Sequence, residues 1–158
     1  MPESTPSYRD VDCASTLRDC IAHLRLEDAK ARDVAPAFAP ETQRSLTAHD
    51  SVHVIFACDT SDRGEAIAHA WMLLGTDVTH RQLLNVTGAR DHTRIVREIG
   101  VPRRLSALLS ALPAIFDAAL RARRMTHRWS WNGYEAWLDK PLTEIRAAHG
   151  VILPVRRR

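Results

Sequence analysis

Two histidines and two acidic residues in the middle of the chain have types and spacings suited to binding a metal ion. His49, Asp50 and His53 form the pattern H-D-x-x-H, and Glu65 follows after eleven further residues. In a helix, His49 and His53 lie one turn apart on the same face, and Asp50 lies about 100° round from His49. Imidazoles and carboxylates without a thiolate suit zinc or iron first, and then magnesium or manganese. We therefore predict that His49, Asp50, His53 and Glu65 bind a divalent metal.

Each of these residues also has an ordinary structural explanation. The helix dipole favours an acid such as Glu65 in a first turn, and His49 and His53 would fit as hydrogen-bonded core residues. Their joint occurrence at this spacing favours the metal site. His69 lies four residues after Glu65 and on the same helical face. It is either a fifth metal ligand, a partner that orients Glu65, or a polar residue of an otherwise apolar helix.

The whole pattern resembles the metal-binding signature of the coenzyme Q (ubiquinone) biosynthesis protein four family. The similarity continues through Gly64-Glu65-Ala66-Ile67-Ala68, and a weaker one extends from Tyr134 to Arg146, whereas Val52 replaces the aromatic residue usual in that family. The resemblance implies an all-α protein with a divalent metal beside a hydrophobic channel for a prenylated precursor. It also implies a role in ubiquinone or prenylquinone biosynthesis, either organising other enzymes of the pathway or supporting oxidative decarboxylation or hydroxylation of the ring.

The hydrophobic pattern predicts one all-α domain over residues 1–158, a helical bundle with the metal site between two adjacent helices. Flexible tails are expected at 1–8 and 154–158. The predicted helices cover 11–32, 41–58, 63–74, 79–86, 91–99, 103–124 and 141–148, with a kink or break at Pro113. A short buried strand over 51–57 is the alternative to the end of the second helix.

Two groups of apolar residues leave alternatives open. A stripe in the longest helix either packs in the core or lines a lipid channel, and consists of Leu105, Leu108, Leu109, Leu112, Ile115, Phe116 and Ala119. Trp129, Trp131 and Trp137 either lie at a membrane interface beside nearby arginines or cap the core.

The charge balance excludes a uniformly basic nucleic-acid-binding protein. The chain has 22 basic and 19 acidic residues, and the two signs balance once Arg156, Arg157 and Arg158 are set aside. The polar N-terminus and the odd number of cysteines favour a cytoplasmic protein without disulfides. The arginine tail would allow weak peripheral contact with the inner face of a membrane. A homodimer is a further expectation.

Two rival functions are consistent with parts of the sequence. Residues 79–99 resemble a helix-turn-helix DNA-binding motif with Gly88 in the turn. The His49-Asp50 doublet also occurs in metal-dependent hydrolases, which need a further histidine and aspartate. His23 and either Asp91 or Asp117 could be nominated for these roles, although their spacing does not support them.

Overall fold

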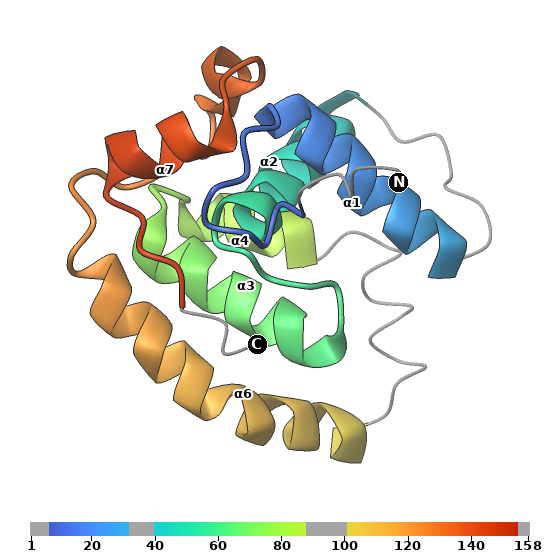
Figure 1. The fold of residues 1–158 in the computed structure, drawn as a ribbon. Helices are drawn as coiled ribbons and strands as arrows, with labels where there is room; N and C mark the ends of the chain where they lie inside the picture. Colours follow the sequence, from blue (N-terminus) through green and yellow to red (C-terminus); the bar gives the residue numbers. More distant parts are fainter. Residues whose placement is uncertain (1–6, 32–39, 88–100, 155–158) are drawn as a thin grey trace, which may run out of the picture.

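Helices account for all regular structure in the part of the chain that the computed structural model describes, residues 7–31, 40–87 and 101–154. Figure 1 shows their arrangement, with α2 and α3 in the middle of the molecule. The helices are α1 (Leu17–Ala31), α2 (Pro40–Ile55), α3 (Asp62–Gly75), α4 (His80–Thr87), α6 (Val101–Ala122), the 3-10 helix η1 (Tyr134–Trp137) and α7 (Leu142–His149). The predicted all-α single-domain bundle is confirmed.

The predicted helix boundaries agree with the structure to within two residues except at the start of α1 and at the end of α2, which stops at Ile55 and not at residue 58. Helix α1 begins at Leu17, because the Thr16 hydroxyl accepts a hydrogen bond from the backbone N–H of Asp19 and caps the first turn. The strand alternative over 51–57 is wrong, since α2 continues to Ile55. The predicted helix over 91–99 lies outside the described residues.

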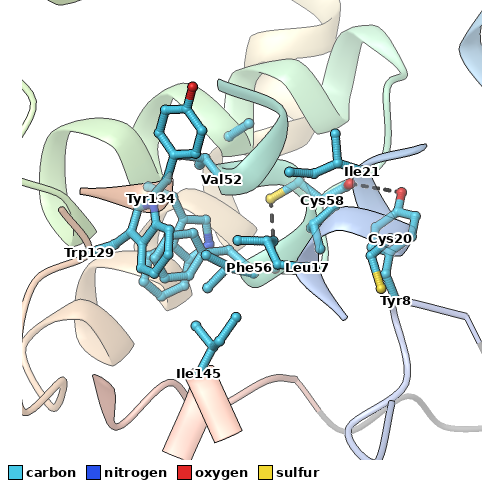
Figure 2. Packing of buried hydrophobic residues seen from close by; sticks show 14 of the residues in the cluster. Tyr8, Leu17, Cys20, Ile21, Val52, Phe56, Cys58, Trp129, Tyr134 and Ile145 are labelled. Atoms are coloured by element: carbon cyan, nitrogen blue, oxygen red, sulfur yellow. Dashed lines mark hydrogen bonds between the residues drawn. The ribbon is translucent and has the colours of Figure 1, made fainter. Parts of the chain in front are cut away.

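The core is built around the side chains that α2 turns inward, together with Trp129 (Figure 2). Trp129 is fully buried, and its indole N–H donates to the Ser51 hydroxyl at 3.1 Å. Trp131 is buried as well, so for these two residues the core alternative is confirmed and the membrane-interface alternative is wrong. Tyr8 is also buried, and its hydroxyl donates to the Cys58 carbonyl, so the predicted N-terminal tail is wrong at this residue.

Arg146 of α7 holds the C-terminal end of α2 in place. Its guanidinium donates to the backbone oxygens of Val54 and Ile55 at 2.9 and 3.0 Å, and to those of Tyr8 and Asp10 in the N-terminal segment. The last carbonyls of a helix carry partial negative charge and have no partner within the helix, so they suit a buried cation. Burial lowers the pKa of Arg146 to about 10, which leaves it charged at neutral pH.

Helix α6 lies along the outer side of α3 (Figure 1). Its buried residues include Ala111 and Ala118, whereas Leu105, Leu112 and Phe116 are exposed. Small side chains let two helices approach closely, and here the alanine face of α6 packs against the protein. The predicted core packing is therefore wrong for the four leucines of the stripe and Phe116, whereas Ile115 and Ala119 are partly buried. Pro113 does not break the helix, which continues to Ala122.

None of the described helices combines the length and the apolar character needed to cross a membrane.

Candidate metal site

The site lies where α2 ends and α3 begins, at a tight corner of the backbone. The end of α2 has the two hydrogen bonds of a Schellman motif. The N–H of Cys58 donates to the His53 carbonyl at 2.9 Å, and the N–H of Ala57 donates to the Val54 carbonyl. Ala57 has the left-handed conformation that this motif requires, with φ of 57°. The chain therefore reverses within a few residues and returns alongside the last turns of α2.

The start of α3 is capped by Ser61. Its hydroxyl accepts a hydrogen bond from the N–H of Gly64 at 3.1 Å, and its carbonyl accepts one from the N–H of Glu65. Asp59 supports the cap by accepting hydrogen bonds from the backbone and the hydroxyl of Ser61. A side chain at position 64 would overlap the Asp59 carbonyl and carboxylate, so only glycine fits beside Glu65.

This corner brings three of the four predicted ligands together. The rings of His49 and His53 have centroids 4.7 Å apart on one face of α2, and the Glu65 carboxylate reaches both. One carboxylate oxygen lies 3.6 Å from His49 Nε2, and the other lies 3.4 Å from His53 Nε2. One ligand atom from each residue lies within 4.8 Å of the others, so His49, His53 and Glu65 could hold a metal ion.

His53 is the most deeply buried member of the group. It is 1% exposed, and within the described residues neither of its ring nitrogens makes a hydrogen bond of good geometry, although Nε2 faces the Glu65 carboxylate at 3.4 Å. Buried polar groups in proteins nearly always have partners, because an unsatisfied group costs about 1–3 kcal/mol. The Glu65 side chain is 26% exposed, although its Oε2 atom is buried, so the group is less enclosed on the Glu65 side than on the His53 side.

The charges of the group favour an anionic carboxylate between the two imidazoles. Burial alone raises the pKa of Glu65, but the interactions with His53, followed by the charges of His49 and His69, outweigh it and lower that pKa to about 2. For His53, burial lowers the pKa, and the neighbouring Glu65 and Asp50 outweigh it in the opposite direction. Glu65 is therefore ionised at neutral pH and ready to bind a cation.

Asp50 has a different neighbour from the predicted one. Its carboxylate accepts a hydrogen bond from Arg25 Nε of α1 at 2.7 Å, and Asp50 is not among the three converging ligands. The physical reason is the rotation of about 100° from His49 along the helix, which directs Asp50 towards α1. Arg25 was not predicted, because its position in the sequence has no periodic relation to H-D-x-x-H.

His69 lies beside the group, as its position on α3 predicts. Its ring is 5.8 Å from that of His49, and its Nδ1 bonds to the Glu65 backbone carbonyl at 2.8 Å. A carbonyl only accepts, so Nδ1 carries the proton and Nε2 is the unprotonated nitrogen in the neutral ring. Such a bond to backbone is how proteins fix the tautomer of metal-binding histidines.

Other nominated residues lie away from the group. His23 is on the exposed part of α1 beside Glu27, and Asp117 pairs with Arg121 within α6. Asp91 lies outside the described residues, as do the turn and the second helix of the predicted helix-turn-helix motif; α4 covers its first helix. Burial raises the pKa of the Cys58 thiol, and Cys58 is not among the residues whose ligand atoms converge at the site.

Comparison with protein-family models, curated proteins and solved structures finds no match for this chain.

Proposed function

We propose that His49, His53 and Glu65 bind a divalent metal ion, zinc or iron in the first place. The observation that carries this proposal is the His53 ring, which is buried, makes no hydrogen bond of good geometry with the described residues and faces an ionised carboxylate at 3.4 Å. Two neutral imidazoles and one carboxylate match the ligand preferences of both metals. The metal would satisfy the buried nitrogen and the carboxylate together.

Three protein ligands leave coordination positions for another molecule. A tetrahedral ion would keep one open position and an octahedral ion three, which is typical of catalytic or substrate-binding sites. A metal bound there would polarise a carbonyl or hydroxyl oxygen, and iron would add redox chemistry. Glu65 contributes the negative charge, and the partial exposure of its side chain marks the side from which a small molecule can approach.

Asp50 and Arg25 form an ion pair between α1 and α2 next to the candidate site. The ion pair connects α1 to the turn of α2 that carries His49 and His53. Burial raises the pKa of Asp50, and Arg25 opposes this effect most strongly. We infer that the pair orients the histidine-bearing turn without binding the metal itself.

We further propose that the molecule bound at the open side is a prenylated precursor of ubiquinone or a related quinone. This assignment is supported by the complete H-D-x-x-H and Glu65 pattern of the coenzyme Q biosynthesis protein four family. The protein would either present the precursor to other enzymes of the pathway or support oxidative decarboxylation or hydroxylation of its ring.

Metal analysis of the purified protein tests the first proposal. We expect about one equivalent of metal in the wild type, as for a single site whose ligands fold into place. His53→Ala should lose it, whereas His127→Ala, which changes an exposed histidine outside the site, should keep it. Equal metal content in the wild type and His53→Ala, or none in the wild type, would refute the metal site.

Native mass spectrometry of the metal-loaded protein tests the precursor. We expect added prenylated 4-hydroxybenzoate to bind to the wild type and to bind less to His53→Ala. A wild type that holds its metal but binds no prenylated aromatic acid would refute the quinone assignment and leave the metal site standing.

A further inference from the structure

The outer face of α6 is an unusually large apolar surface for a protein in water. Six large side chains on this helix are between 43% and 67% exposed, namely Leu105, Leu108, Leu109, Leu112, Phe116 and Leu120. Side chains that are each about half exposed leave on the order of 500 Å² of apolar surface in water, a size that marks interaction sites. We call these six residues the leucine face.

The spacing within the leucine face is that of a helix-pairing seam. Leu105, Leu109, Leu112 and Phe116 follow one another at intervals of four, three and four residues. These are the alternating intervals of a heptad, which keep successive side chains along one line of a helix facing a partner helix. The opposite side of α6, at Ala111 and Ala118, is already buried.

Charge distribution separates the kinds of partner that this face could have. Between Leu105 and Leu120 the sequence has one charged residue, Asp117, and its carboxylate pairs with Arg121 Nε at 2.6 Å. Helices that lie on a membrane surface carry many lysines and arginines along the polar flank of the apolar face. The arginines of α6, Arg103, Arg104 and Arg121, lie at the two ends of the leucine face, and none lies between Leu105 and Leu120. A seam without basic residues along its length suits a second neutral apolar surface, and an identical face is one.

We propose that the protein forms a two-fold symmetric dimer in which α6 packs antiparallel on α6 of a second copy. In the register with matching heptad positions, Leu109 lies opposite the partner's Leu112, and Leu105 lies opposite the partner's Phe116. Each pair occurs twice, as two-fold symmetry requires. Complete coverage of the leucine face in both copies would bury about 1,000 Å², which reaches the lower limit for a specific interface.

Light scattering coupled to size-exclusion chromatography tests the dimer. At about 100 μM, well above a micromolar dissociation constant, we expect the wild type to have twice the chain mass of 17.8 kDa. Leu109→Glu should have the monomer mass while keeping the wild-type circular dichroism spectrum. Leu26→Glu changes an equally exposed leucine of α1 and should remain a dimer. A monomeric wild type, or a dimer that survives Leu109→Glu, would overturn the proposal.

Cysteine cross-linking tests the register without destabilising the contact. Leu112→Cys lies close to the two-fold axis, so mild oxidation should give a covalent dimer, whereas Leu26→Cys should not. The three native cysteines are buried, which keeps the background low. Binding to vesicles that contain anionic lipid tests the alternative that the leucine face contacts a membrane. If the wild type is monomeric and Leu109→Glu abolishes vesicle binding, the face is a lipid surface and the dimer is refuted.

Discussion

A carboxylate between two imidazoles is the central feature of the candidate metal site. Glu65 approaches both His49 and His53 within 3.6 Å, and its pKa of about 2 keeps it charged in spite of burial. Asp50 is equally acidic and adjacent to His49 in sequence, yet its carboxylate pairs with Arg25. The sequence predicts both Glu65 and Asp50 as ligands, but the two carboxylates have different neighbours in the structure. Substituting each of them in turn can therefore distinguish their roles.

We predict that Glu65→Gln and Asp50→Asn weaken metal binding to very different degrees. Glu65→Gln removes the anionic ligand, and the metal affinity should fall by more than the roughly 10–100-fold that loss of an orienting partner costs. Asp50→Asn removes only the pairing with Arg25, so its loss should stay within that range. Isothermal titration with Zn²⁺ measures both. Equal losses in the two variants would show that Asp50 is itself a ligand.

Sequence periodicity was sufficient to predict three members of the site but could not identify the neighbour of Asp50. His49 and His53 share a face in any helix, and Glu65 follows a corner short enough to bring it back beside them. Whether Asp50 faces the metal or another helix depends on how α1 packs against α2. That packing brings Arg25 to Asp50 across a separation of 25 residues, which local spacing does not encode.

The corner between α2 and α3 sets the position of Glu65 relative to the histidines. It combines a Schellman motif at the end of α2 with the Ser61 cap of α3. Both halves have features that sequence alone would not favour. Ala57 occupies the left-handed position where glycine is usual, and Asp59 is partly buried beneath the cap.

We predict that Ala57→Gly stabilises the protein. The left-handed conformation costs alanine about 1–2 kcal/mol, whereas the greater freedom of glycine in the unfolded chain costs about 0.4–1 kcal/mol, so the net gain is about 0.5–1 kcal/mol. Urea denaturation measures the free energy of unfolding. Ala66→Gly, within α3, is the control and should destabilise by about the same amount. Destabilisation by Ala57→Gly would contradict the corner as described.

We predict that the contribution of Asp59 to stability depends on pH in the acid range. Burial raises its pKa, but the hydrogen bonds from Ser61 outweigh burial and lower it below 3.8. A lowered pKa in the folded state gives stability that is complete above the unfolded value and is lost as the pH falls through the folded value. The difference in unfolding free energy between wild type and Asp59→Asn should therefore be constant near pH 7 and shrink below about pH 4. A difference that does not change with pH would contradict this.

The pattern of α6 shows why an apolar face is easier to predict than its partner. The leucine stripe is correctly an apolar face of a helix, but helix periodicity does not say whether the protein's own core covers it. The alanines on the other side pack inward and leave Leu112 and Phe116 in water. Alanines contribute less to a hydrophobic pattern than leucines do. The pattern of α6 therefore predicted that the leucine side faces the core, whereas the alanine side does.

Across the whole molecule, Arg146 connects segments that are far apart in the sequence. It joins α7 to the end of α2, next to the corner that leads into α3, and to the segment around Tyr8 and Asp10. Within the described residues, all the hydrogen-bond acceptors found for the Arg146 guanidinium are backbone carbonyls, and none is a carboxylate.

We predict that Arg146→Met destabilises the protein by about 3 kcal/mol, because it leaves several buried carbonyls without a donor. Arg146→Lys should recover only part of this loss, since one ammonium group cannot reproduce the planar fork of donors. Thermal and urea unfolding measure both, with the exposed Arg128→Met as control. A loss for Arg146→Met no larger than that for Arg128→Met would contradict this role.

The most direct test of the metal site is anomalous diffraction from crystals of the wild-type protein grown with Zn²⁺ and measured on both sides of the zinc absorption edge. We predict one strong peak at about 2.0–2.2 Å from His49 Nε2, His53 Nε2 and a carboxylate oxygen of Glu65. Zinc-free density between these three side chains, or a peak bound by other residues in their place, would contradict the account.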